Sequence, residues 1–389
     1  MIPHWGIVTL SMETGGNYMK DLPNVTICGS GSAGTAMAAD ISLFGCKVNL
    51  YELPDFEDNL KPIQDHHGIE LTGNTCSGKT GRASLNRITS NAEEATEDVE
   101  LIMITVPAYG HEAFFEKLSP YLVEGQTILV NTGYWASLRV KELLKSRGVL
   151  EKVTVAETHI MPYLSRKVGP AHAHIYNLKR DIRMSAWPAT KNDAAYEVVR
   201  RVYPQISLSK NVIENNFYPG NPSIHPQITI PKAAFFFERA REFRFYSEVS
   251  LCASKLSDAF DRERMKVAAA LGCDVPYGFE WVQRAYAYGG QDLYEIFGSV
   301  TCEHAKRWDN NAGIRRVLRE DLCYFFVPME QLAEVLGIDI PVTKAIIEIL
   351  KIFTDYDYRS NGVTLKDLGM EGFTTKDQIV NYATYGEAT

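Results

Sequence analysis

Apolar and polar residues follow two different periods along the chain. From about residue 24 to 208, short apolar runs alternate with amphipathic segments. The runs typical of strands are residues 25–29, 47–52, 100–107, 127–133 and 153–157, and the helical segments between them are residues 33–44, 111–122 and 137–148. Strands that alternate with helices predict right-handed crossovers and a largely parallel, doubly wound α/β sheet.

The second half of the chain has the 3.6-residue period of amphipathic helices. Its longest periodic segments are residues 247–272, 311–337 and 341–358, and glycines that typically end helices recur among them. We therefore expect an all-helical domain after a linker near residues 204–211. The predicted organisation is an N-terminal appendage (1–22), a sheet domain (23–208) and a helical domain (209–389).

Composition and charge narrow the classes of function. The 389 residues include 40 Lys and Arg against 48 Asp and Glu, a net charge of −8, which argues against a nucleic-acid surface. No apolar run approaches the roughly 20 residues of a membrane span. The seven cysteines form no Cys-x-x-Cys pair, which favours reduced thiols in a cytoplasmic protein, and the first 20 residues do not resemble a signal peptide.

A glycine-rich turn is the main candidate binding site. Gly29, Gly31 and Gly34 form a G-x-G-x-x-G pattern between an apolar strand and a helix of small residues. Gly29 permits a tight turn, Gly31 lets the backbone approach a pyrophosphate, and Gly34 allows close packing of helix and strand. The helix N-terminus presents free N–H groups to the anion. The rest of the predicted cradle is Ser30, Ser32 and Ala33.

The carboxylate expected in such a site is Glu52, at the end of the second strand. It would accept hydrogen bonds from the adenosine ribose. The next residues include Asp55, Glu57 and Asp58 but no Lys or Arg, so a 2′-phosphate would meet repulsion. The sequence therefore favours NAD over NADP.

Residues 73–80, GNTCSGKT, match the phosphate loop of nucleotide hydrolases and include Lys79. A true phosphate loop opens a helix, whereas the residues that follow alternate like a strand. We interpret residues 69–73 and 84–90 as a β-hairpin with these glycines in its turn.

Histidine is the side chain whose unperturbed pKa suits acid–base chemistry at neutral pH. His66 and His67, and His172 and His174, have no third ligand at metal spacing, so we expect no metal site. His225 lies in NPSIHP, one helical turn after Asn221, and shares a face with it if Asn221 starts a helix.

Three blocks of the sequence together resemble the opine dehydrogenase family, which includes the octopine, nopaline and N-(carboxyethyl)-amino-acid dehydrogenases. They are the glycine pattern with Glu52, the NPSIHP segment, and RVLREDLCYFFVP from Arg316 to Pro328. The loops TVPAYGHE and VAETHIMPYLSRK and residues 338–372 continue the likeness, which spans about residues 24–385.

The resemblance implies a Rossmann domain, a helical domain and a site in the cleft between them. It implies an enzyme that joins an α-keto acid to the amino group of an amino acid and reduces the imine with NADH or NADPH. His225 would be the general acid/base, and Asp321 would orient it. Arg316 would bind a substrate carboxylate, and Asn221 would hydrogen-bond substrate or nicotinamide. Val106 and Pro107, in the TVPAYGHE loop, join the predicted cofactor site.

The helical spacing of the third block leaves the choice of carboxylate open. Arg316 and Asp321 are five residues apart, roughly 140° round an ideal helix, so they cannot both point squarely at one ligand. Glu320, four residues from Arg316, is the better helical neighbour and the ordinary ion-pair partner. The family motif favours Asp321. The apolar segment LCYFF replaces a small-residue loop of the family, and its aromatic groups are candidates for shaping the amine pocket.

Other functions remain open at this point. A 2-keto acid or keto-alcohol reductase of the same two-domain plan would use a lysine, for which Lys232 is the nearest candidate. A non-catalytic NADH-binding protein and a nucleotide hydrolase using Lys79 rank below it. The sequence names neither the keto acid nor the amine, and it leaves monomer and homodimer open.

Overall fold

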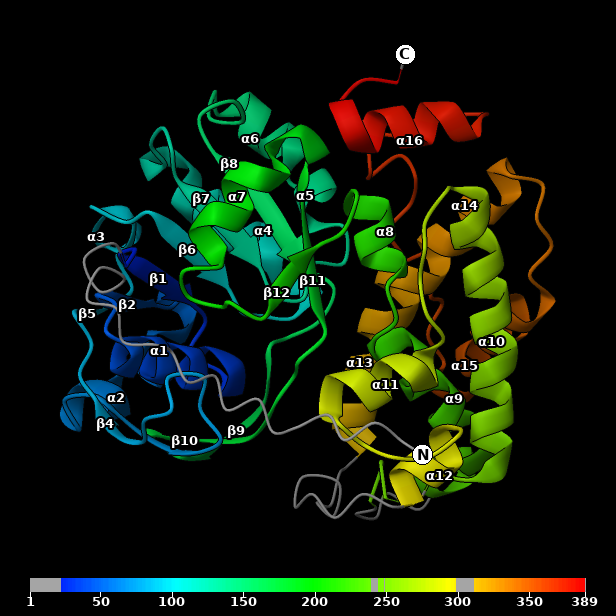
Figure 1. The fold of residues 1–389 in the computed structure, drawn as a ribbon, viewed down its shortest axis with the longest axis horizontal. Helices are drawn as coiled ribbons and strands as arrows, with labels where there is room; N and C mark the ends of the chain where they lie inside the picture. Colours follow the sequence, from blue (N-terminus) through cyan, green and yellow to red (C-terminus); the bar gives the residue numbers. More distant parts are fainter. Residues whose placement is uncertain (1–21, 239–243, 248, 299–310, 389) are drawn as a thin grey trace, which may run out of the picture.

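The computed structural model describes residues 22–238, 244–247, 249–298 and 311–388. A half built on a sheet lies beside a half built from helices (Figure 1), which confirms the predicted fold class. The predicted appendage, apart from Leu22, lies outside the described residues.

The strands alternate with short helices through the first half of the chain. They are β1 (Val25–Cys28), β2 (Val48–Tyr51), β3 (Ile69–Gly73), β4 (Gly81–Ala83), β5 (Arg87–Thr89), β6 (Leu101–Ile104), β7 (Thr127–Val130), β8 (Thr154–Thr158), β9 (Tyr163–Gly169), β10 (His172–Leu178), β11 (Ile182–Trp187) and β12 (Ile206–Leu208).

Helices connect these strands and then build the second half. They are α1 (Ser32–Phe44), α2 (Lys61–Asp65), α3 (Ala92–Thr96), α4 (His111–Leu118), α5 (Ala136–Arg139), α6 (Lys141–Ser146), α7 (Asn192–Val199), α8 (Val212–Phe217), α9 (His225–Thr229), α10 (Leu251–Ala270), α11 (Gly278–Tyr286), α12 (Leu293–Gly298), α13 (Asn311–Asp321), α14 (Val327–Val335), α15 (Pro341–Thr354) and α16 (Lys376–Tyr385).

The main sheet has the strand order of a dinucleotide-binding domain. Within the described residues its order is β12-β11-β8-β7-β6-β1-β2-β5. The strands from β5 to β8 are parallel, while β11 runs antiparallel to β8. From β1 the chain crosses first to β2 and later to β6, on the other side of β1. Ligands bind at such a switch point, outside the carboxyl ends of the strands.

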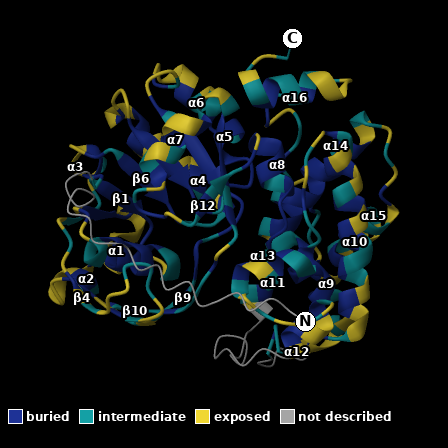
Figure 2. Cartoon of the chain, viewed as in Figure 1, coloured by how far each residue is buried: buried dark blue, intermediate teal, exposed yellow. Residues whose placement is uncertain are grey.

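The central strands are buried on both faces. Every residue of β1, β6 and β7 is buried, as expected for parallel strands covered by helices on both sides, and Figure 2 shows this core within the sheet. One cluster of buried apolar residues extends from Ile27 of β1 to Phe217 of α8 and Phe326. The two halves therefore pack against each other through a continuous apolar interior.

The predicted hairpin is correct at its tip and wrong in its second strand. β3 pairs antiparallel with β4, and residues 73–80 lead into β4 and not into a helix, so the phosphate-loop pattern is a turn. The second predicted strand, 84–90, contains β5, which pairs parallel with β2 in the main sheet. There it satisfies backbone groups that would otherwise be unpaired at the edge of β2.

The C-terminal helix α16 returns to the sheet half. Its Tyr382 carbonyl oxygen accepts a hydrogen bond of 2.9 Å from the indole of Trp187 in β11, and its hydroxyl lies 2.7 Å from the Lys141 ammonium. The last helix thus helps to hold the two halves together.

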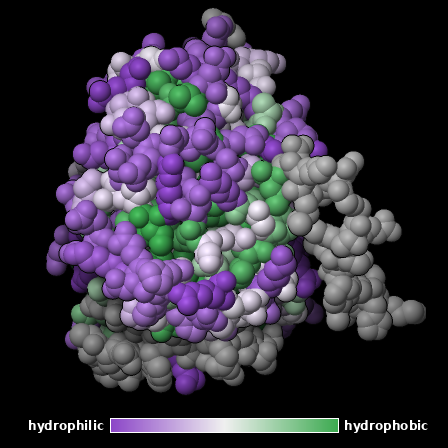
Figure 3. Space-filling model, turned by 90° about the vertical axis from the view of Figure 1, so that its left-hand side faces the viewer, coloured by the Kyte–Doolittle hydropathy of each residue, from purple (hydrophilic) through white to green (hydrophobic). Residues whose placement is uncertain are grey.

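The outer surface of the sheet half is mostly hydrophilic, with hydrophobic residues gathered near the centre of the view (Figure 3). Among the described residues, no helix has the length and apolar character needed to span a membrane.

Candidate active site

The glycine turn lies at the carboxyl end of β1, at the switch point of the sheet. Gly29 has φ of +98°, and a Cβ there would lie 2.5 Å from Val106 Cγ1. A Cβ on Gly34 would lie 1.8 Å from the Gly29 carbonyl oxygen, so only glycine allows α1 to start so close to the turn. Gly31 has no atom within 4 Å of such a Cβ. The turn is therefore tight on its protein side and open at Gly31, as a pyrophosphate cradle requires.

Glu52 braces this turn from the end of β2. Its carboxylate accepts hydrogen bonds from the Ser30 amide (2.8 Å), the Ser30 hydroxyl (2.7 Å) and the Leu53 amide (2.9 Å). A carboxylate has about four acceptor positions, so capacity is left for a ribose hydroxyl. Ser32 and Ala33 form the first turn of α1. The residues present thus fit the adenosine side of a dinucleotide.

The loop after β6 covers the other side of the turn. Val106 packs against Gly29, and Pro107 precedes the 3-10 turn Ala108–Gly110. The Val106 carbonyl oxygen lies 3.1 Å from His111 Nε2 at the start of α4. Burial lowers the pKa of His111 to about 3. The imidazole is therefore neutral and can donate to this carbonyl, which anchors the start of α4 to the loop after β6.

His225 is buried at the start of α9, in the helical half. Its Nδ1 lies 2.8 Å from Asp321 Oδ2, and the two side chains are 5% and 1% exposed. Asp321 is the last residue of α13. The structure thus brings together a histidine and a carboxylate that lie 96 residues apart in the sequence, and it places Asp321, not Glu320, against the ring.

A tyrosine from the sheet half completes this pair. The Tyr134 hydroxyl donates a hydrogen bond of 2.7 Å to Asp321 Oδ1 and also contacts the Asn221 side chain. Burial, and next the charge of Asp321, raise the pKa of Tyr134 well above its usual value. Tyr134 therefore remains a protonated donor at neutral pH.

The loop that carries Tyr134 follows β7 and is held by the buried Glu157. This carboxylate accepts from the Trp135 amide (3.2 Å), the Ser137 amide (2.8 Å) and the Asn216 side chain (2.6 Å). Burial raises the pKa of Glu157, and these hydrogen bonds oppose the increase. Because Asn216 belongs to α8, Glu157 fixes the loop to both halves of the molecule.

The neighbouring carboxylate, Glu320, faces the loop after β6. Its Oε1 accepts a hydrogen bond of 2.8 Å from the Ala108 amide, and burial raises its pKa. Arg316 lies 3.8 Å from Glu320, with its side chain about half exposed. The ordinary ion pair expected from the spacing is therefore formed, and the Arg316 guanidinium still reaches the surface.

The second imidazole nitrogen of His225 meets a second tyrosine. The Tyr246 hydroxyl lies 2.8 Å from Nε2, and Phe245 packs edge-on against the ring at 5.6 Å.

Of the aromatic residues in the LCYFF segment, Tyr324 packs edge-on against Tyr134, with ring centroids 6.4 Å apart. Phe325 and Phe326 are buried against the core, with Phe326 stacked on Phe260. The suggestion that this segment shapes an amine pocket stays a prediction, with Tyr324 as its candidate residue.

Tyr134 and Tyr246 were not among the residues selected from the sequence. A signal for Tyr134 exists, since it follows a buried strand whose carboxyl end belongs to the ligand-binding edge of the sheet. Tyr246 lies in no strand and no α-helix of the structure. Only the fold brings it to His225.

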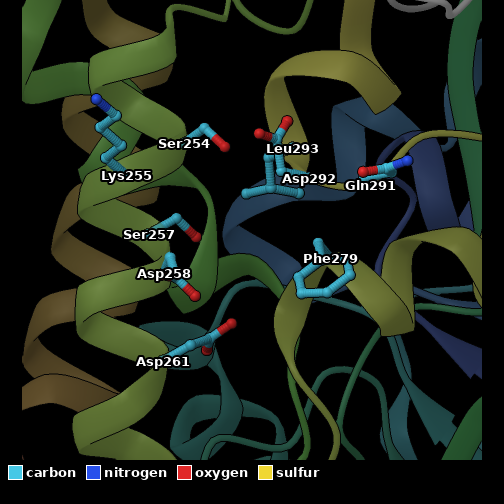
Figure 4. A pocket seen from close by; sticks show the side chains of 9 residues that line it. All are labelled: Ser254, Lys255, Ser257, Asp258, Asp261, Phe279, Gln291, Asp292 and Leu293. Carbon is cyan, nitrogen blue, oxygen red and sulfur yellow. The ribbon is translucent and has the colours of Figure 1, made fainter.

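A cavity of about 240 Å³ lies between α10, α11 and α12 (Figure 4). Its lining residues are Ser254, Lys255, Ser257, Asp258, Asp261, Phe279, Gln291, Asp292 and Leu293. Two of these residues, Ser257 and Asp261, hydrogen-bond Ser223. They therefore hold the segment between Asn221 and His225 in place. Among the residues that the structure describes, no group of three His, Cys, Asp or Glu side chains is arranged to hold a metal ion.

Residues 208–354 match the family model described as NAD/NADP octopine/nopaline dehydrogenase, alpha-helical domain. The opine dehydrogenase of Arthrobacter sp. (strain 1C) is 28% identical over 92% of this chain and 98% of its own length. The vitopine synthase of Allorhizobium ampelinum is 24% identical over 90% and 96%.

A structure of octopine dehydrogenase in complex with NADH and agmatine has the same fold, with a TM-score of 0.73 and 18% identity over 92% of this chain and 98% of that one. The predicted resemblance to the opine dehydrogenase family is confirmed by the family model and by these relatives. That solved structure holds NADH, and the family description names NAD and NADP.

Alanine substitutions at Gly31 and Gly34 should have different effects, one on NADH affinity and the other on the stability of the fold. Gly34→Ala forces a Cβ into the Gly29 carbonyl oxygen and should lower the free energy of unfolding by about 1–3 kcal/mol in urea titrations. Gly31→Ala meets no protein atom, so it should unfold like the wild type and bind NADH at least about tenfold more weakly in fluorescence titrations. Equal stability of both variants would contradict the tight packing at Gly34.

Removing the Tyr134 hydroxyl should destabilise the protein, because a buried Asp321 oxygen then lacks its donor. Tyr134→Phe should lower the free energy of unfolding by about 1–3 kcal/mol in urea titrations. Tyr121→Phe, at a tyrosine that is 41% exposed, is the matched control and should have no effect. A Tyr134→Phe protein as stable as this control would show that the hydrogen bond contributes nothing.

Proposed function

We propose that this chain is a member of the opine dehydrogenase family and an NAD(P)-dependent oxidoreductase acting on CH–NH groups. Its proposed reaction joins an α-keto acid to the amino group of an amino acid by reductive amination. The observation that carries the proposal is the buried contact of 2.8 Å between His225 Nδ1 and Asp321 Oδ2. It lies beside the loops after β6 and β7, where the sheet half meets the helical half.

His225 acts as the general acid/base. Amine and keto group condense with loss of water, the C=N carbon gains a hydride and the nitrogen gains a proton. When bound, NADH supplies the hydride. Asp321 fixes the proton of the neutral ring on Nδ1 and stabilises the imidazolium, as carboxylates do in histidine-based sites. Nε2 then exchanges protons with the substrate. A hydroxyl, that of Tyr246, already reaches Nε2 at hydrogen-bond distance.

Arg316 and Asn221 bind the substrate. A planar guanidinium suits a carboxylate because it forms two parallel hydrogen bonds. Arg316 lies on the helix that also carries Asp321, and its side chain is about half exposed. Its guanidinium can therefore bind a substrate carboxylate without breaking a fully buried ion pair. Asn221 lies four residues before His225 and contacts Tyr134, which directs its amide toward the same group of residues.

NADH is the proposed cofactor. Glu52 lies at the turn with acceptor capacity for a ribose hydroxyl, and Asp55, Glu57 and Asp58 after it are exposed. These acidic residues disfavour a 2′-phosphate. We further propose the domain boundaries 23–208 and 209–389, a cytoplasmic location, and a monomer or homodimer.

The direct test is an NADH-oxidation screen of keto acids crossed with amino acids, followed by product mass. Oxidation should require both substrates, and the product mass should equal their sum minus one oxygen. Oxidation by a keto acid alone would instead indicate a 2-keto acid reductase. NADH binding without oxidation by any pair would indicate a non-catalytic protein.

His225→Ala should reduce turnover by about 10²–10⁴-fold, because the proton donor is lost. NADH affinity in fluorescence titrations should stay near that of the wild type, since the glycine turn belongs to the other half. His66→Ala, at an exposed histidine, is the control and should turn over normally. Near-normal turnover of His225→Ala would remove the acid/base assignment.

A further inference from the structure

Strand β9 runs alongside α1 toward the glycine turn. At its start, the Tyr163 hydroxyl donates 2.8 Å to Asp40, in the third turn of α1. Two residues later, the Ser165 hydroxyl contacts the Ser32 carbonyl oxygen at 3.4 Å. At Lys167 the backbone amide donates 3.1 Å to the Ser32 hydroxyl. Every second residue of β9 therefore contacts α1, and the last two of these reach its first residue, Ser32.

The side chain of Lys167 continues this series. Residues two apart on a strand share a face, so Lys167 follows Tyr163 and Ser165 onto the side of β9 that contacts α1. Its position is half-buried. Partial burial lowers the pKa of Lys167, and the charge of Glu52 opposes this change. The ammonium is thus within electrostatic range of the carboxylate that braces the turn.

The surroundings of this ammonium suit an anion. The first turn of α1 contains no acidic residue, and its N–H groups carry the positive end of the helix dipole. Gly31 opens onto free space at the same end. A pyrophosphate carries two negative charges, and a lysine acts on phosphate as a point charge. Glu52, within electrostatic range of this ammonium, already has its own oxygens engaged by Ser30 and Leu53.

We propose that Lys167 binds a pyrophosphate oxygen of the dinucleotide, from a position 135 residues after Ser32 in the sequence. The role of Lys167 rests on the nicotinamide dinucleotide site of the proposed function, and it is independent of the proposed reaction. The glycine turn then supplies backbone donors from one side, and β9 supplies the cation from the other. Glu52 keeps the recognition of the ribose.

The test is a fluorescence titration of the full chain with NADH and with NADPH, at two salt concentrations. Lys167→Gln should bind both nucleotides about tenfold more weakly than the wild type, and its affinity should depend less on salt. Lys167→Arg, which keeps the charge, should restore most of the affinity. Lys79→Gln, at an exposed lysine in the turn between β3 and β4, is the matched control and should bind like the wild type.

Unchanged affinity of Lys167→Gln, with a circular dichroism spectrum like that of the wild type, would overturn the proposal. So would a loss confined to NADPH, because it would place the ammonium at the 2′-phosphate. A wild-type chain that binds neither nucleotide would overturn both this role and the proposed cofactor. NADH binding that depends on Lys167, in a chain without reductive amination, would refute the proposed reaction and leave the role of Lys167 standing.

Discussion

One buried carboxylate connects the two halves of this protein at the point where its chemistry is expected. Asp321 shares its two oxygens between the Tyr134 hydroxyl of the sheet half and the imidazole of His225. A buried carboxylate is costly unless it is hydrogen-bonded, and here both oxygens have a partner only when the halves are docked. The hydrogen bonds that stabilise the buried Asp321 therefore also fix the position of His225 relative to the carboxyl ends of the strands.

The adjacent carboxylate makes the same connection one residue earlier. Glu320 accepts from the Ala108 amide in the loop after β6, while Asp321 reaches the loop after β7. Successive residues of a helix point in different directions, so two neighbouring carboxylates can engage two neighbouring loops at once. The end of α13 is thus bound to the loops that follow both β6 and β7, beside the switch point of the sheet.

In the glycine turn, too, the protein groups already have their partners, and an open space remains at Gly31. The contacts of Gly29 and Gly34 forbid a side chain, whereas Gly31 faces no protein atom. Glu52 stabilises the turn through Ser30. A site whose protein contacts are already made before the ligand arrives loses little conformational freedom on binding. This preorganisation holds whichever amine and keto acid are substrates.

The sequence by itself determined the features that depend on local order. Alternating periods predicted a sheet half followed by a helical half, and the G-x-G-x-x-G spacing predicted the turn before α1. The resemblance to the family's Asn-x-x-x-His-Pro and Arg-x-x-x-Glu-Asp motifs selected His225 and Asp321, whereas helical spacing alone favoured Glu320. Strand pairing was predicted less well, because β5 joins β2 through an edge that no local pattern marks. The tertiary structure placed Asp321 against His225, as the motif had favoured. Only the tertiary structure brought Tyr134, Tyr246 and Lys167 to the two sites. These contacts join residues far apart in the chain, and their partners are set by how strands and helices pack, not by any spacing along the sequence.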